Sequence, residues 1–209
     1  WSSDVCSSDL EAQKKVCTMT LDQREQIISL IRKKTHENAE ILANMGVNET
    51  GMGNVGDKIL KHHLTADKVP GTEDISTIAW SGDRGLTLVE MGPFGVIGAI
   101  TPATNPSETV ICNCIGMLAG GNTVVFNPHP NAKKTTIYTI NMINEASIEA
   151  GGPDNIAVTV EAPTLDTSAI MMKHPSIHLL VATGGPGVVT AVLSSGKRAI
   201  GAGAGNPPV

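Results

Sequence analysis

The 209-residue sequence predicts an α/β protein built on an open, Rossmann-like parallel sheet with helices on both faces. From residue 96 onward, short segments rich in Val and Ile alternate regularly with longer segments of helical character. Short strands that are apolar on both sides are typical of parallel sheets covered by helices, and their alternation with helices implies right-handed crossovers. Hydrophobic residues make up 41% of the chain and aromatic residues 2%, so we expect a core of Ile, Leu, Val, Ala and Met.

The first ten residues differ in character from the rest of the chain. They contain the tripeptide Ser-Ser-Asp twice with Cys6 between the two copies, and they do not begin with Met. We interpret residues 1–10 as a non-native leader left by cloning or sequence assembly, with a short native leader as the alternative. They are left out of the predicted fold.

Residues 11–83 are predicted to form an N-terminal helical part. Apolar residues recur at helical spacing from residue 21 to residue 45, with Thr20 as a start signal and Gly46 as a stop. A second helix is expected over residues 54–64.

The glycines of residues 51–56 match G-x-G-x-x-G, the fingerprint of a dinucleotide-binding turn. The match follows a predicted helix and not a strand, so we expect no nucleotide there. Turn residues then predict a loop over residues 68–84. A single strand is expected within residues 84–92, where apolar and polar residues alternate weakly.

The strand–helix alternation occupies residues 93–209. The predicted strands span residues 96–101, 123–126, 156–159, 178–182 and 198–200. The predicted helices span residues 107–119, 133–150, 164–173 and 187–195. Open parallel sheets bind ligands beyond the carboxyl ends of their strands. The segments that follow four of these strands are rich in Gly, Pro, Asn and Thr, and they form the candidate site.

Asn105 is the sharpest candidate for chemistry. It lies where the first of these strands gives way to a helix, between Pro102 and Pro106, which favour extended backbone before them and a helix start after them. In a structural interpretation, Asn105 and Glu108 form a capping box at that helix start. In a functional interpretation, the Asn105 amide points into the cleft and donates a hydrogen bond to an oxyanion.

The pattern P-x-G-V-x-x-x-x-x-P-x-x-N-P over residues 93–106 resembles the aldehyde dehydrogenase superfamily, and the resemblance extends from residue 11 to residue 209. It implies an NAD-binding sheet domain, a separate catalytic domain and an oligomerisation arm, for which the strand within residues 84–92 is the candidate. It also implies a catalytic role for Asn105, which would hold the oxyanion of a tetrahedral adduct. The catalytic domain and its nucleophilic cysteine are then expected beyond Val209, so that this chain is an N-terminal fragment.

Two positions resemble the CoA-acylating branch of the superfamily. Asn127 stands where hydrolytic members usually carry a lysine that contacts the adenosine ribose, and Ala202 stands where they carry a glutamate base. Alanine cannot activate water, so an enzyme thioester would wait for the more easily ionised thiol of coenzyme A. The resemblance thus implies oxidation of a short-chain aldehyde to acyl-CoA with NAD and CoA. The alternatives are the N-terminal half of a bifunctional aldehyde–alcohol dehydrogenase and a non-catalytic nucleotide-binding fragment.

The cofactor-binding residues implied by this resemblance lie at the strand ends. They are Thr101, Pro102, Ala103, Thr104, Asn127, Pro128, His129, Pro130, Thr183, Gly184, Gly185 and Gly203.

Composition and spacing exclude several other classes. A net charge of −5 disfavours nucleic acid as a partner, and no apolar run approaches the roughly 18 residues of a membrane span. No metal site is predicted, because the four cysteines lack metal-pair spacing and Pro175 separates His174 from His178. We therefore expect a cytoplasmic protein, homo-oligomeric in its full-length form, with residence inside a bacterial microcompartment as a second location.

Overall fold

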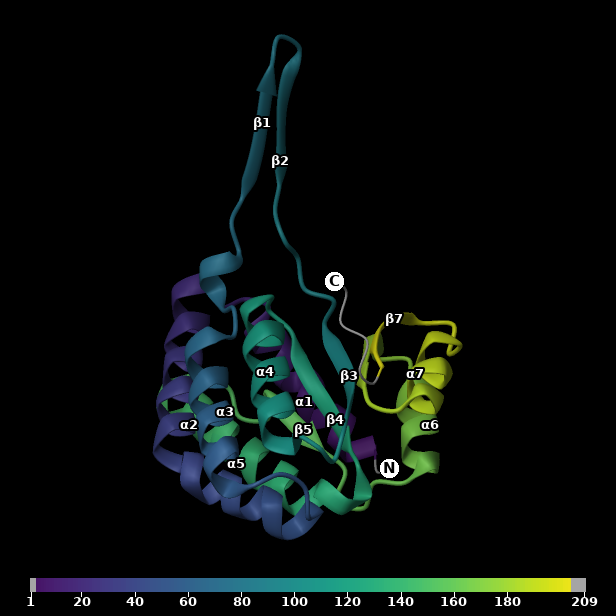
Figure 1. Cartoon of the computed structure of the whole chain (residues 1–209). Coiled ribbons are helices and arrows are strands. Elements are labelled where there is room, and N and C mark those ends of the chain that lie inside the picture. Colours follow the sequence, from purple (N-terminus) through teal and green to yellow (C-terminus); the bar gives the residue numbers. More distant parts are fainter. Residues whose placement is uncertain (1–2, 204–209) are drawn as a thin grey trace.

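The computed structural model describes residues 3–203, which form a five-stranded sheet with helices on both faces and a long hairpin that stands away from them (Figure 1). The strands of the sheet are β3 (Val96–Thr101), β4 (Thr123–Pro128), β5 (Ala157–Thr159), β6 (Ile177–Thr183) and β7 (Arg198–Ala202). Their order across the sheet is β5-β4-β3-β6-β7, and every neighbouring pair is parallel. The predicted fold class is confirmed.

The helices divide between the two faces of the sheet. One face is covered by α4 (Pro106–Ala119) and α5 (Lys133–Glu149), with α2 (Leu21–Thr50) and α3 (Val55–Lys68) packed outside them, and the other by α6 (Leu165–Lys173) and α7 (Pro186–Leu193). Two short 3-10 turns, η1 (Thr72–Asp74) and η2 (Pro130–Ala132), complete the body. Within residues 3–203, no helix is both long and apolar enough to cross a membrane.

Each face of the sheet has its own hydrophobic core, and β3 and β4 are buried along their whole length. Gly98 in β3 allows close packing in the core on the side of α6 and α7. A Cβ atom there would lie 3.0 Å from Cδ2 of Leu180 and 3.2 Å from Cγ2 of Ile177, closer than side chains normally pack. A glycine in this strand therefore brings the packed side chains of β6 against β3.

The N-terminal helices follow the predicted starts but not the predicted stop. Thr20 caps α2 with a complete capping box, as its position suggested. The stop at Gly46 is wrong, because α2 continues to Thr50 and ends at Gly51 in the left-handed conformation that glycine favours. The G-x-G-x-x-G match at residues 51–56 joins two helices, and Asn54 caps the second of them.

Residues 3–10 belong to the segment interpreted from the sequence as a non-native leader. In the structure they form the first half of helix α1 (Ser3–Val16). Asp9 is fully buried in this helix, and its carboxylate oxygens have no hydrogen-bond partner among the described residues. Burial raises the pKa of Asp9 to about 8; the hydroxyl of Thr123 opposes this rise, although the two groups do not meet in hydrogen-bond geometry. The helix is therefore part of the folded body and carries a costly buried carboxyl group.

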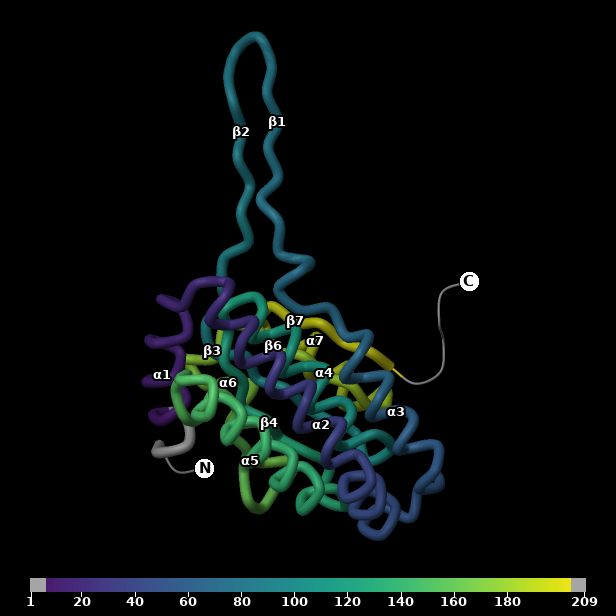
Figure 2. The backbone as a smooth tube through the Cα atoms, turned by 90° about the vertical axis from the view of Figure 1, so that its left-hand side faces the viewer, coloured from purple at the N-terminus to yellow at the C-terminus, as the bar shows by residue number. Residues whose placement is uncertain are grey.

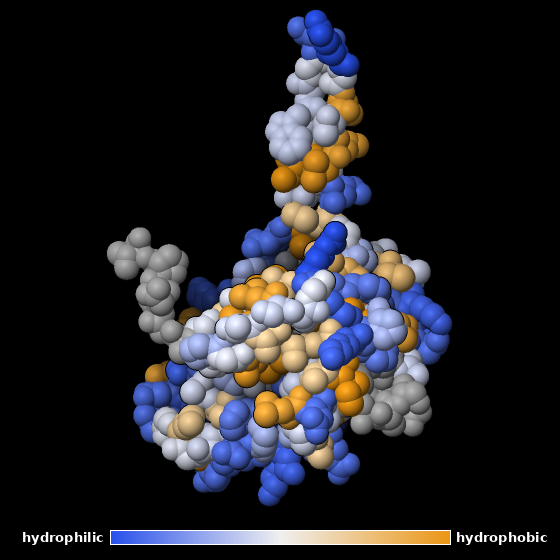
Figure 3. Space-filling view, turned by 90° about the vertical axis from the view of Figure 1, so that its right-hand side faces the viewer, coloured by the Kyte–Doolittle hydropathy of each residue, from blue (hydrophilic) through white to orange (hydrophobic). Residues whose placement is uncertain are grey.

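The arm differs from its prediction. The structure contains two antiparallel strands here, β1 (Ile78–Gly82) and β2 (Gly85–Val89), where a loop and a single strand were expected. They form a hairpin that extends well beyond the body (Figure 2). All residues of both strands are exposed, including Trp80, Leu86 and Leu88, and hydrophobic residues gather on the middle of the hairpin (Figure 3). The short segment of β1 was missed because its residues do not alternate and end in turn-favouring Ser-Gly.

Candidate functional site

The candidate site lies at the carboxyl ends of the central strands, where the strand order reverses. The chain proceeds from β3 to β4 and β5 on one side of the sheet, and later adds β6 and β7 on the other. The loops that leave β3 and β6 therefore turn to opposite faces and leave a crevice between them. Such a switch point is the usual ligand site of an open parallel sheet.

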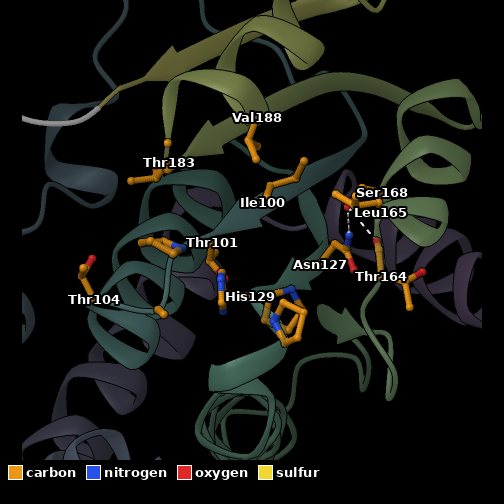
Figure 4. A pocket seen from close by; sticks show the side chains of 16 residues that line it. Ile100, Thr101, Thr104, Asn127, His129, Thr164, Leu165, Ser168, Thr183 and Val188 are labelled. Carbon is orange, nitrogen blue, oxygen red and sulfur yellow. Dashed lines mark hydrogen bonds between the residues drawn. The ribbon is translucent and has the colours of Figure 1, made fainter. Parts of the chain in front are cut away.

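A cavity of about 510 Å³ occupies this crevice (Figure 4). Its volume lies within the range of small-molecule sites. All of the predicted cofactor residues except Gly203 line it. The structure adds five lining residues that sequence reasoning missed, namely Ile100, Thr164, Leu165, Ser168 and Val188. Thr164, Leu165 and Ser168 lie within the first turn and a half at the start of α6, so helical periodicity could have grouped them, but no motif marks them as facing the end of β4.

Asn127 is fixed by helix α6 at the end of β4. Its Nδ2 donates to Oγ of Ser168, and its Oδ1 accepts from Oγ1 of Thr167 at 3.1 Å. Asn127 is buried, and both ends of its amide are already engaged. The Asn127 side chain therefore lines the cavity in a fixed orientation. It is shorter than the lysine expected at this position in hydrolytic members and does not reach across the cavity.

The donors around the cavity fit a dinucleotide. Oγ1 of Thr101 is buried at the cavity wall and has no hydrogen-bond partner among the described residues, an unsatisfied group of the kind that calls for an explanation. Helix α7 begins beside the cavity after Gly185 and has no side-chain cap; Pro186 has no N–H and the amides of Val188 and Val189 donate to the Gly185 carbonyl, so the Gly187 amide is the donor in this turn that remains for a ligand. A helix N-terminus with uncapped amides favours phosphate groups. Around Gly184 and Gly185 a Cβ atom would meet no protein atom within 4 Å, which leaves room for close approach.

Two predicted site residues lie outside this cavity. Gly203 follows β7 at the exposed edge of the sheet and is itself exposed, because β7 ends beside Thr183 and not over the crevice. Asn105 lines a separate open hollow of about 310 Å³ with residues of α3 and α4. The preceding residue, Thr104, lines the larger cavity, so the two hollows flank a single loop.

The capping-box interpretation of Asn105 is wrong. Its backbone carbonyl accepts from the amide of Thr109 at 3.1 Å, but its side chain makes no capping hydrogen bond. Instead, Oδ1 of Asn105 accepts from Nζ of Lys61 at 3.1 Å. Glu108, the expected box partner, is buried beside Lys58 with 3.4 Å between Oε1 and Nζ. The Asn105 amide is thus available for a role other than closing the helix.

The cysteines of α4 are poorly suited to nucleophilic chemistry. Burial raises the pKa of both the Cys112 and the Cys114 thiol, and Cys114 is fully buried. Both are therefore thiols at neutral pH, while the reactive form is the thiolate. Over residues 3–203, no group of three His, Cys, Asp or Glu side chains is placed to hold a metal ion.

Comparison with known proteins identifies the family. The model of the aldehyde dehydrogenase family matches residues 4–203. The chain belongs to the aldehyde dehydrogenase family. Among curated family members, an acetylating acetaldehyde dehydrogenase of Bilophila wadsworthia is 51% identical over 95% of this chain and 41% of its own length. A bifunctional aldehyde-alcohol dehydrogenase of Escherichia coli is 36% identical over 95% of this chain and 23% of its own length.

Solved structures of the family agree with this fold. A propionaldehyde dehydrogenase from the fucose utilisation microcompartment of Clostridium phytofermentans has 73% identity and a TM-score of 0.94, covering 97% of this chain and 46% of that one. A Rhodopseudomonas palustris propionaldehyde dehydrogenase with bound propionyl-CoA has 49% identity and a TM-score of 0.94, covering 98% of this chain and 46% of that one. The chain therefore spans less than half the length of the relatives it matches.

Proposed function

We propose that the protein to which this chain belongs is a CoA-acylating aldehyde dehydrogenase. It would convert a short-chain aldehyde, CoA and NAD⁺ into acyl-CoA, NADH and a proton. The observation that carries the proposal is the loop at residues 102–105, whose first three residues line the switch-point cavity and whose last residue, Asn105, lines the neighbouring hollow. The likeness to acetaldehyde and propionaldehyde enzymes supports the acylating reaction and the short substrate.

In this proposal the switch-point cavity holds NAD. The Thr101 hydroxyl and the backbone amide of Gly187, in the first turn of α7, would donate hydrogen bonds to it, and Asn127 would border its ribose. When bound, NAD accepts the hydride that leaves the aldehyde carbon. No Lys or Arg is among the residues that line the cavity, which favours NAD over NADP with its additional phosphate.

Asn105 would serve the reacting carbonyl. Attack of a cysteine thiolate on the aldehyde places negative charge on the carbonyl oxygen, and an amide N–H stabilises that charge. Because the pKa of both the Cys112 and the Cys114 thiol is raised, we assign the nucleophile to neither of them. Following the family resemblance, we assign the nucleophile to a cysteine outside residues 3–203.

After hydride transfer the acyl group would be bound to the enzyme cysteine as a thioester, and Ala202 would determine which nucleophile releases it. Ala202 ends β7, paired with Thr183 of β6. An alanine at the position of the glutamate base cannot take a proton from water. The acyl group would therefore pass to the CoA thiolate, with release of the enzyme cysteine.

The test uses the protein encoded by the complete reading frame that contains this sequence. NADH formation from propanal and NAD is measured with and without CoA, and the organic product is identified by mass spectrometry. We expect NADH formation to depend on CoA and to yield propanoyl-CoA. Equal rates without CoA, with propanoate as the product, would reject the acylating assignment.

A fused aldehyde–alcohol dehydrogenase is the second candidate, supported by the Escherichia coli relative. The higher identity to a single-function enzyme, 51% against 36%, favours the stand-alone form. Homo-oligomer formation through the hairpin is also part of the proposal, supported by the exposed apolar side chains of β1 and β2. The microcompartment source of the Clostridium phytofermentans enzyme supports a microcompartment location alongside the cytoplasmic one.

A further inference from the structure

The Asn105 side chain is oriented by a lysine from a different helix. Nζ of Lys61, on α3, donates to Oδ1 of Asn105 at 3.1 Å. An ammonium group can only donate, so this contact places the amide oxygen toward α3. Nδ2 of Asn105 has no hydrogen-bond partner among the described residues, and Asn105 lines the open hollow.

The part of α3 that carries Lys61 is anchored to the Asn105 loop by a buried polar network. Nζ of Lys58 lies 3.0 Å from the carbonyl of Thr104 and 3.4 Å from Oε1 of Glu108. Lys58 and Glu108 are both buried, so their pairing is screened little by solvent. The network holds the residue before Asn105 and a residue of the helix after it.

His62 provides the second contact between α3 and the segment that follows Asn105. Its Nδ1 lies 2.7 Å from the carbonyl of Lys58, which can only accept, so Nδ1 carries the proton. Its Nε2 lies 2.8 Å from Oγ of Ser107, and that hydroxyl also lies 3.2 Å from Oε2 of Glu108. Burial lowers the pKa of His62, which favours this neutral form. Lys58, Lys61 and His62 thus present one helical face to residues 104–108.

We propose that Lys61 is a positioning residue for the Asn105 amide in aldehyde oxidation. Its ammonium fixes which end of the amide faces the carbonyl oxygen, and by polarising the amide it strengthens the N–H donor. The buried anchor of Lys58, Glu108, His62 and Ser107 keeps α3 at the distance that this contact needs. The inference rests on the proposed function, because it acts through the oxyanion role of Asn105.

The test is a double-mutant cycle in the enzyme encoded by the complete reading frame. Single-turnover NADH formation from propanal is measured for Lys61→Met, Asn105→Ala and the double variant, so that product release does not mask the chemical step. We expect Lys61→Met to slow this step about tenfold, the size of one hydrogen bond to a charged group. Asn105→Ala should slow it about 10²–10³-fold, and adding Lys61→Met should cause no further loss.

Two further variants separate positioning from structure. Lys61→Arg keeps a cationic donor and should restore most of the rate. Lys68→Met removes an exposed lysine at the end of the same helix and should behave like the parent enzyme. Thermal midpoints and the KM for NAD should be unchanged by Lys61→Met, since Lys61 is exposed and lies outside the nucleotide cavity.

The outcomes separate this inference from the proposed function. Losses that multiply in the double variant, or an unaffected Lys61→Met enzyme, would overturn the positioning role alone. An Asn105→Ala enzyme with the parent rate would overturn the oxyanion role as well.

Discussion

The Thr101 hydroxyl shows how a single residue links fold and function. Thr101 is 2% exposed, lies at the end of the central strand β3 and lines the cavity. Its Oγ1 has no hydrogen-bond partner among the described residues. Leaving a buried hydroxyl without a hydrogen bond has a free-energy cost in the unliganded protein. Such a group is explained when a ligand supplies the missing partner.

Replacing Thr101 by Val tests this role, because Val has the same shape without the hydroxyl. We expect the NAD dissociation constant, measured by calorimetry, to rise about tenfold, and the thermal midpoint to stay the same or increase. Thr101→Ser keeps the hydroxyl and serves as the control for binding. A lower midpoint with unchanged NAD affinity would show that the hydroxyl serves the fold instead.

Asp9 predicts a pH dependence of stability. Its folded pKa of about 8 lies above its ordinary value of 3.8, so the folded state holds the proton more tightly than the unfolded state. This contribution to stability is fully present below pH 4 and is lost as the pH rises toward 8. We expect Asp9→Asn to gain stability over the parent by about 1.4 kcal/mol for each pH unit across that window, measured by urea unfolding. A constant difference from pH 4 to 8 would mean that Asp9 is ionised in the folded protein.

The limits of sequence reasoning are clearest at Asn105. The spacing of Asn105, Pro106 and Glu108 predicted where the helix starts, because helix starts are decided by local residues. It could not predict that Lys61, 44 positions away, would take the Asn105 oxygen, or that Glu108 would pair with Lys58. Those contacts depend on how α3 packs against α4.

Among the elements, the sheet rests on the close packing of β3 against β6. Gly98→Ala would place a methyl group 3.0 Å from Leu180 and 3.3 Å from Met171, so these side chains must shift. We expect a loss of about 1–3 kcal/mol in the free energy of unfolding, measured by urea denaturation. Gly116→Ala is the control, since nothing lies within 4 Å and alanine favours a helix interior, and it should gain about 0.5–1 kcal/mol. Equal effects of the two changes would contradict this packing argument.

Elements that are decided locally were predicted, and those decided by packing were not. The alternation of strands and helices after residue 96 carries both apolar periodicity and turn residues, so the sheet could be predicted. The hairpin could not, since β1 and β2 are exposed throughout and show no core-facing pattern. Gly46 has the local character of a helix stop, but it is buried within α2 where that helix packs against α3, and α2 ends only at Gly51.

At the scale of the whole molecule, the hairpin of β1 and β2 is exposed along both strands and is not packed against the body. Leu86 and Leu88 are 65% and 61% exposed, and contiguous exposed apolar side chains of this kind are typical of interaction surfaces. If the hairpin assembles the enzyme, changing both leucines to Asp should lower the oligomer mass measured by analytical ultracentrifugation. Thr87→Asp, on the opposite face of the same strand, is the control. An unchanged mass would exclude this face from the interface.

The proposed roles of Thr101, Asn105 and Asn127 all require NAD to bind in the switch-point cavity. A crystal structure of the complete enzyme with NAD tests this directly. We expect the nucleotide between Asn127 and Thr183, with the Thr101 hydroxyl hydrogen-bonded to it and the Asn105 amide facing its reactive end. NAD bound elsewhere, with the switch-point cavity empty, or an Asn105 amide turned away from the reactive end, would contradict the account.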